Sequence, residues 1–229
     1  MRVYIIGFFS LLAAISCTNS CNDGLTVRET ELIRGADSIM RVLTIEDSVD
    51  SSILRASSRD FSAASLLSSD FKRLADLMVA TVTHPSQDGV GIAGPQIGLN
   101  RRVVAVQRFD KEGNPFEVYP NVKIVWASDS LAYGPEGCLS VPDRRGEVLR
   151  SQEIVVEYAD LRELSAGRVE EGQWAGYYDS SRNSKDSGVR GCTCGTTIPM
   201  TRDTVRGFTA VIFQHEIDHL DGTLYIDRL

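Results

Sequence analysis

The sequence predicts an α+β fold, on three observations. Strand-like runs rich in β-branched residues occupy the middle of the chain, one amphipathic helix follows them near the end, and no internal repeat is visible. Strands grouped apart from helices are typical of α+β domains. The chain has 229 residues, of which 42% are hydrophobic, so it is long enough to form one domain with a buried core.

The first third of the chain contains one clear helical period. Residues 25–39 are compatible with either a strand or a helical turn. In residues 70–82, apolar side chains recur at helical spacing, including Phe71, Leu74 and Met78. We expect Asp70 to cap this helix and Pro85 to end it.

A glycine-rich stretch, residues 88–98, separates this helix from the predicted strands. The strands are expected at residues 102–109, at 117–126 with an interruption at Pro120-Asn121, and at 153–158.

Residues 161–206 are rich in Gly, Ser, Arg and Asp and show no sustained hydrophobic period. We interpret them as a long, partly ordered insertion between two core elements. A helix is then expected at residues 208–220, where Val211, His215 and His219 share one face.

The N-terminus predicts export. In residues 1–16, Arg2 precedes an apolar stretch that is shorter than the roughly 20 residues of a membrane-spanning helix, as in a signal peptide. Residues 12–17 resemble a bacterial lipoprotein processing site, although Ala14 stands where such sites usually carry Leu. Cleavage before Cys17 would leave a lipid-anchored chain, with residues 17–40 as a tether and N-terminal segment and residues 41–229 as a single domain. A periplasmic protein with a plain secretory signal, or an uncleaved anchor, is the alternative.

The strongest chemical signal is the motif His215-Glu216-Ile217-Asp218-His219. In a helix, positions i and i+4 lie on one face, so two imidazoles can bind one divalent ion. Glu216, beside the first ligand, can reach a water on that ion and act as a base. A chance match on an amphipathic helix is the alternative. The chain has three histidines, and we expect the remaining one, His84, to be structural or at the surface.

A catalytic metal site needs a third protein ligand and an open coordination position. The metzincin pattern fails because Tyr225 stands where its third histidine would be, and no Glu follows the motif as in thermolysin-like proteases. The third ligand must therefore precede the helix. The best candidate is Cys138, because a thiolate binds iron(II) or zinc well. A lone cysteine can also be a small buried apolar residue.

Three segments together resemble the peptide deformylase family, in the family's order. They are residues 89–98 (GVGIAGPQIG), 136–140 (EGCLS) and 214–222 (QHEIDHLDG). A weaker likeness extends from about Arg41 to the C-terminus, apart from the insertion. Gly94 departs from the family's usual Ala, which removes a methyl group beside the site and adds backbone freedom. The insertion and the lack of a helix beyond Leu229 also depart, and they affect the expected substrate range more than the chemistry.

The resemblance implies a peptide deformylase-like fold, with antiparallel β-sheets around a central metal-binding helix. It also implies removal of the N-formyl group from N-formylmethionyl peptides, releasing formate, by attack of a metal-activated water. Glu216 would be the general base, and the Gln96 side-chain amide and the Leu139 backbone N–H would stabilise the oxyanion. Cys138, His215 and His219 would hold Fe²⁺, with Zn²⁺ or Ni²⁺ as alternatives.

The substrate should also meet a set of residues around this centre, in a pocket that is largely apolar. The expected contacts are Gly91, Ile92, Gly94, Gly137, Arg145 and Ile212. Glu136 is expected either to orient a neighbour through a salt bridge, for example with an arginine, or to lie at the surface.

The expected partners are a formylated peptide and, through Cys17, a membrane. A net charge of −7 provides no basic field for nucleic acid, and we expect a monomer. If Cys17 carries lipid and Cys138 binds metal, three cysteines remain, an odd number whose disulfide pairing the sequence does not determine: Cys21, Cys192 and Cys194.

Two other functions stay open at this point. An exported enzyme meets few nascent chains, so it could act on formylated or other short N-acyl peptides outside the cytoplasm. The protein could instead be a metal-binding lipoprotein whose insertion holds a ligand. Endopeptidase activity is disfavoured because no ligand follows the metal-binding motif.

Overall fold

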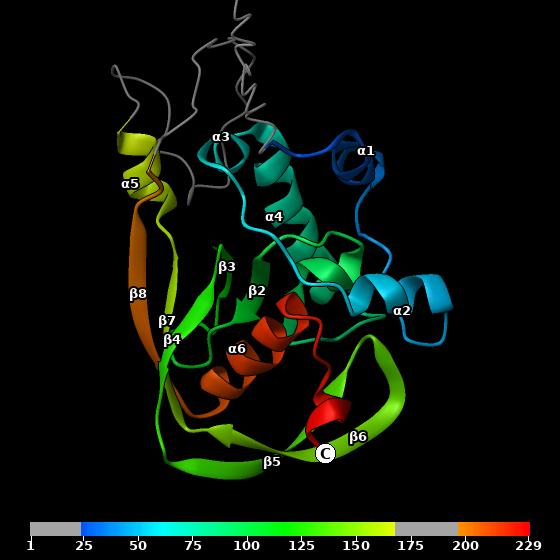
Figure 1. Ribbon diagram of the computed structural model, residues 1–229, viewed down its shortest axis with the longest axis vertical. Helices are drawn as coiled ribbons and strands as arrows, with labels where there is room; N and C mark the ends of the chain where they lie inside the picture. The colour runs from blue at the N-terminus through cyan, green and yellow to red at the C-terminus, as the bar shows by residue number, and fades with distance from the viewer. Residues whose placement is uncertain (1–23, 168–196) are drawn as a thin grey trace, which may run out of the picture.

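The computed structural model describes residues 24–167 and 197–229 (Figure 1). The predicted signal peptide, Cys17 and the three cysteines of undetermined pairing lie outside these residues, and Cys138 is a free thiol within them. Inside the described ranges, no helix combines the length and apolar character that crossing a bilayer requires. The helices are α1 (Val27–Gly35), α2 (Ser48–Leu54), α3 (Ala63–Leu66), α4 (Ser69–Val82), α5 (Leu161–Ala166) and α6 (Gly207–Leu220), with short 3-10 helices η1 (Gly94–Ile97) and η2 (Tyr225–Arg228).

The strands form three antiparallel sheets, with orders β1-β2-β3, β4-β7-β8 and β5-β6. Their bounds are β1 (Gly91–Ala93), β2 (Val103–Gln107), β3 (Phe116–Pro120), β4 (Lys123–Ala127), β5 (Leu131–Cys138), β6 (Val141–Ser151), β7 (Glu153–Ala159) and β8 (Met200–Arg206). Figure 1 shows α6 in the middle of the molecule, between these sheets and the N-terminal helices. The predicted α+β class, with antiparallel sheets around a central helix, is confirmed.

Helix α6 is buried on most of its surface because it packs against all three sheets. Its residues Ala210, Phe213 and Ile217 join Val104 and Val156 from two of the sheets in one hydrophobic cluster. A helix that is buried nearly all round is held rigidly, and this fixes the direction of the side chains that it carries.

A second hydrophobic cluster lies under the N-terminal helices. Phe71, Leu74 and Met78 of α4 pack there with Ile33 of α1. The open choice at residues 25–39 is therefore resolved as a helix, which begins with a capping box between Thr26 and its third residue. This helix is part of the packed core.

Helix α4 occupies the predicted range, but its cap differs from the prediction. The Ser68 side chain accepts the backbone N–H of Phe71, and Asp70 lies within the first turn of the helix, paired with Arg34. One clear helix was predicted before the strands, whereas four helices precede them. Two of these four helices span seven residues or fewer, which is too short to show a clear hydrophobic period in the sequence.

The long β5-β6 hairpin was not predicted, and it carries the metal-binding cysteine. Strand β5 contains Gly134, Pro135 and Gly137, residue types that are depleted in strands. Most of its residues are exposed, so the sequence lacks the alternation that would reveal it.

The expected insertion, residues 161–206, is narrower in the structure. Its first residues form α5, and its last residues form β8, which pairs with β7 from Glu153↔Arg206 to Ala159↔Met200. Strand β8 was missed because most of its residues are charged or polar and Val205 alone among them is buried, so it lacks an apolar alternation. Residues 168–196 lie outside the described part of the chain.

Candidate metal centre

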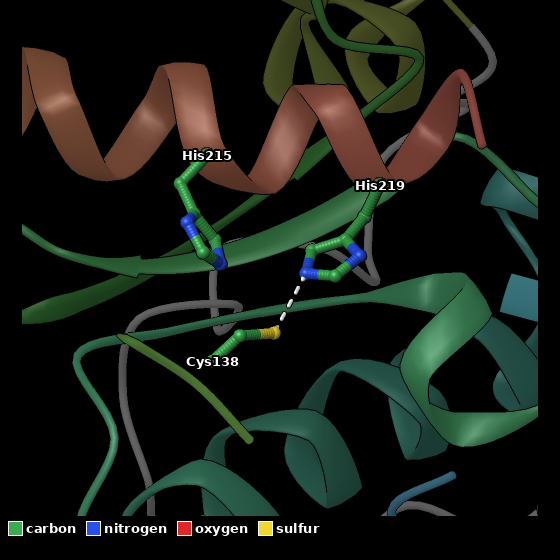
Figure 2. Close-up of side chains that lie close together, drawn as sticks. All are labelled: Cys138, His215 and His219. Carbon is green, nitrogen blue, oxygen red and sulfur yellow. Dashed lines mark hydrogen bonds between the residues drawn. The ribbon is translucent and has the colours of Figure 1, made fainter. Parts of the chain in front are cut away.

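His215 and His219 lie one turn apart on α6 and project to the same side of it (Figure 2). Their ring centroids are 5.1 Å apart. His219 is fully buried, and the side chain of His215 is 10% exposed. The predicted i, i+4 pair is therefore present on a helix that the core holds in place.

Cys138 ends strand β5 and points at the two imidazoles. Its Sγ lies 3.2 Å from His219 Nε2, and the three potential ligand atoms of Cys138, His215 and His219 all lie within 4.8 Å of one another. Cys138 and His219 are 81 positions apart along the sequence, so the β5-β6 hairpin and α6 together create the cluster.

The cluster fits a divalent metal ion by its donor types and its spacing. Zinc and similar ions bind thiolate sulfur at about 2.3 Å and imidazole nitrogen at about 2.0–2.1 Å, so ligand atoms around one ion lie about 3–4 Å apart. His215 Nδ1 bonds Glu136 Oε2 at 2.8 Å, which leaves Nε2 of that ring for a metal. Three protein ligands would leave one coordination position open.

The charges around the cluster also favour a cation. Burial alone would lower the pKa of His215, but hydrogen bonds to Cys138 and Glu136 outweigh it and raise that pKa well above its ordinary value. The carboxylate of Glu136 and the sulfur of Cys138 therefore favour a positive charge at the His215 ring.

Glu136 is buried between His215 and Arg150. Arg150 donates to both carboxylate oxygens of Glu136, at 2.7 and 3.0 Å. Burial would raise the pKa of Glu136, yet the hydrogen bonds with His215 and Arg150 lower it to about 2. Of the two expectations for Glu136, the orienting role is confirmed: it holds the His215 ring and fixes which nitrogen faces the ligand cluster.

Glu216 lies fully buried beside the ligands and lines the same cavity. Among the residues that the structure describes, none is a hydrogen-bond partner of its Oε2. Burial raises the pKa of Glu216 to about 7, which suits a group that accepts and returns a proton near neutral pH. Gly91 makes room for it, because a Cβ at Gly91 would lie 2.5 Å from Glu216 Oε1.

Gln96 lies in η1 with its amide orientation fixed by hydrogen bonds. Its Oε1 accepts the Ala93 N–H at 2.8 Å, so the NH₂ group faces the site and lies 3.3 Å from Ser140 Oγ and 3.5 Å from Cys138 Sγ. A buried NH₂ beside the ligands is placed to donate to an oxygen at the centre. The expected role of Gln96 in stabilising an oxyanion stays a prediction.

A cavity of about 800 Å³ opens beside the ligand cluster. Of the predicted functional residues, it is lined by Gly91, Gln96, Gly137, Cys138, Leu139, Arg145, Ile212, His215 and Glu216. These residues come from β1, η1, the β5-β6 hairpin and α6. The structure thus brings together side chains from all three sequence motifs.

Two predicted substrate contacts do not line the cavity. Ile92 is fully buried in the cluster under α4, because alternate residues of β1 face opposite sides and Gly91 takes the side of the site. Gly94 is also buried, and a Cβ there would lie 2.6 Å from the Arg101 carbonyl oxygen. The glycine at position 94 is therefore explained by close packing against the neighbouring backbone. The backbone freedom that we expected is not needed to explain it.

Sequence reasoning missed Arg150 and Ser140 near the site, and Phe208 and Val211 in the cavity wall. Ser140 and Val211 lie within the recognised motif and helix, so their positions could have revealed them. Arg150 had no local signal, because its role depends on the register of an unpredicted hairpin. His84 is exposed and bonds Ser86, as expected for a surface residue.

A thiolate and two imidazoles around an open position, with a buried carboxylate beside them, define a metal-dependent hydrolase. The comparisons with known proteins identify its family. The family model described as polypeptide deformylase matches residues 39–174 and 198–229. The chain therefore belongs to the peptide deformylase family, whose members are hydrolases and metalloenzymes.

Two curated relatives illustrate the likeness. A peptide deformylase of Leptospira biflexa is 31% identical over 184 residues, covering 77% of this chain and 82% of the relative. Peptide deformylase 2 of Gloeobacter violaceus is 33% identical over 179 residues, covering 77% and 74%.

Solved structures agree with this membership. A class I type b peptide deformylase from Acinetobacter baumannii, solved with Met-Ala-Ser bound, has a TM-score of 0.60 and 29% identity, covering 83% of this chain and 98% of that one. The Thermotoga maritima enzyme has a TM-score of 0.60 and 25% identity, covering 84% and 99%.

Proposed function

We propose that the protein removes the N-formyl group from N-formylmethionyl peptides and releases formate, with Glu216 as the general base. The observation that carries this proposal is the position of Glu216 and the Gln96 amide on the wall of the cavity beside the cluster of Cys138, His215 and His219. Family membership supports the reaction, and the geometry supports the assignment of roles to these residues.

In this proposal Cys138, His215 and His219 hold the metal ion. Fe²⁺ is the ion we propose, with Zn²⁺ or Ni²⁺ as alternatives for the same ligands. When bound, the ion supplies Lewis-acid chemistry, because it lowers the pKa of water and polarises a carbonyl oxygen.

The chain's own groups then move one proton and stabilise one charge. Glu216 takes a proton from water as the water oxygen bonds to the formyl carbon, and the carbonyl oxygen becomes negatively charged. The Gln96 NH₂ and the Leu139 backbone N–H donate to that oxygen. The carbon–nitrogen bond breaks, Glu216 returns the proton to the amine nitrogen, and formate leaves.

The peptide is proposed to lie along the cavity between α6 and the β5-β6 hairpin. Ile212 offers an apolar wall for the first side chain, and Gly91 and Gly137 line the cavity where the peptide backbone would run. Arg145, exposed on β6 opposite Gly137, is placed to meet peptide carbonyl groups. The Met-Ala-Ser tripeptide bound to the Acinetobacter baumannii enzyme supports a peptide ligand of this length.

The test is formate release by protein purified without oxygen and analysed for metal. We expect formyl-Met-Ala-Ser to be hydrolysed, and Glu216→Gln to lower kcat by about 10² to 10⁴ while the metal stays bound. Glu31→Gln, the same substitution at an exposed position on α1 outside the cavity, is the matched control. Equal rates on formyl and acetyl peptides would favour a broader N-acyl peptide hydrolase, and full activity of Glu216→Gln would contradict the proposed base.

We further propose that the protein is exported and anchored by lipid at Cys17, as a monomer. The support for export and for the anchor is the sequence of residues 1–17. Cys17→Ser should release the protein from the membrane fraction of the producing bacterium. Unchanged membrane partition of that variant would contradict the lipid anchor, and a dimer mass in sedimentation would contradict the monomer.

A further inference from the structure

Asp218, the fourth residue of the metal-binding motif, points away from the ligands and into a chain of alternating charges. It accepts hydrogen bonds from Arg228 at 2.6 and 2.5 Å and from Arg150 at 2.6 Å. The Asp218 side chain is 13% exposed and that of Arg150 is 4% exposed. Neither charge is well solvated, so each depends on its partner.

The chain of charges runs on to a metal ligand. Arg150 grips both oxygens of Glu136, and Glu136 Oε2 bonds His215 Nδ1 at 2.8 Å. Arg228, Asp218, Arg150 and Glu136 therefore connect η2 to the His215 ring without a gap, through contacts of 3.0 Å or less.

Arg228 is the outermost member of the chain of charges. Its removal would leave Asp218 with less positive charge beside it. Asp218 lies in the last turn of α6, where the helix dipole disfavours a negative charge. Without Arg228, Arg150 would be the remaining cation bonded to Asp218 among the contacts that the structure describes. The attraction would draw Arg150 toward Asp218 and weaken the two hydrogen bonds that Arg150 donates to Glu136.

We propose that Arg228 is a positioning residue for the metal centre, which holds the His215 ring in its metal-binding orientation through Asp218, Arg150 and Glu136. This inference rests on the proposed metal site. It assigns η2, which contributes no ligand and does not line the cavity, a part in metal affinity. Substitution of residues that orient metal-binding histidines commonly lowers metal affinity by about 10- to 100-fold.

The test measures Co²⁺ binding to the full-length protein, with the metal alone as the probe. We expect Arg228→Met to raise the Co²⁺ dissociation constant by about 10-fold and to change the visible absorption spectrum of the bound ion. Arg228→Lys, which restores the charge, should recover part of the affinity. The spectrum is informative because a general loss of stability would leave it unchanged.

Arg206→Met is the matched control. Arg206 donates through Nε and Nη2 to Glu153, at 2.8 and 3.0 Å, in the same bidentate arrangement and next to the same helix, but outside the charge chain. An equal loss of affinity in Arg206→Met, or wild-type affinity and spectrum in Arg228→Met, would overturn the role of Arg228. Wild-type protein that fails to bind Co²⁺ would overturn the metal site itself, and the inference with it.

Discussion

At the scale of single residues, the site depends on close approaches that tolerate little change. Gly91 is the clearest case, because its missing side chain leaves the space that Glu216 occupies. The backbone of β1 is hydrogen-bonded to β2 and cannot retreat easily. An added methyl group must therefore displace the carboxylate.

We predict that Gly91→Ala lowers kcat/KM by about 100-fold, since a displacement of about 1 Å at a catalytic group can cost that much. Gly134→Ala is the control, because a Cβ at Gly134, also within a strand, would meet nothing within 4 Å. The measurement is formate release, with circular dichroism to verify the fold. Wild-type activity in Gly91→Ala would show that Glu216 does not need this space.

Gln96 provides a second prediction at this scale. Replacing one donor to an oxyanion typically costs about 10²- to 10³-fold in kcat. We therefore expect Gln96→Leu to lose kcat by about that factor with a smaller change in KM, measured by steady-state formate release. A variant that lost only substrate affinity would place Gln96 in ground-state binding. Urea unfolding of the variant controls for the loss of its bond to Ala93.

Much of the site could be predicted at the residue scale. The spacing of His215, Glu216 and His219 predicts two ligands and a base from helix geometry alone, and Cys138 and Gln96 followed from motif resemblance. Arg150 and Arg228 could not be predicted. Their roles arise from side chains that meet across a hairpin and a 3-10 helix, and nothing local to either arginine indicates its partner.

At the scale of elements, caps decide where the N-terminal helices begin. In α4 the Ser68 hydroxyl accepts the Phe71 N–H, while Asp70 pairs with Arg34 of α1. Sequence alone could place this helix by its apolar period. It could not choose between two neighbouring residues that are both good caps, since that choice depends on where the preceding loop enters.

We predict that Ser68→Ala lowers the free energy of unfolding by about 1 kcal/mol, the usual cost of removing an N-cap side chain. Ser69→Ala, one position into the helix, should change it far less. Urea unfolding at neutral pH measures both. A larger loss in Ser69→Ala would contradict the assignment of the cap.

Buried elements were easier to predict from the sequence than exposed ones. The period of residues 208–220 predicted α6 closely, and buried strands such as β2 and β7 were found by their β-branched residues. The β5-β6 hairpin was missed because it is exposed and rich in glycine, proline and charge. Its pairing is therefore set by long-range contacts with α6 and η2.

At the scale of the whole molecule, an ion pair fastens α1 to the rest of the domain. Arg101, whose side chain is 4% exposed, donates to both oxygens of Glu29 at 2.7 and 2.9 Å. Burial would raise the pKa of Glu29, but hydrogen bonds from Arg101 and Thr26 outweigh it and lower that pKa.

The sign of the resulting pH dependence follows from this lowered pKa. The unfolded carboxyl has a pKa of 4.5, so the ion pair stabilises the fold fully above that pH and loses its effect as the pH falls through the lower pKa of the folded state. We predict that Glu29→Gln is less stable than wild type at pH 7, and that the difference shrinks below about pH 4. Glu31→Gln, on the same helix, is the control, and urea unfolding across pH is the measurement. A difference that grows as the pH falls would contradict the assignment.

The central claim is that Cys138, His215 and His219 bind one ion together and leave a position open. X-ray absorption spectroscopy at the edge of the bound metal tests it most directly. The structure predicts one sulfur at about 2.3 Å, with nitrogen or oxygen neighbours at about 2.0–2.1 Å. The sulfur signal should disappear in Cys138→Ser. A metal shell without sulfur in the wild-type protein would contradict the account.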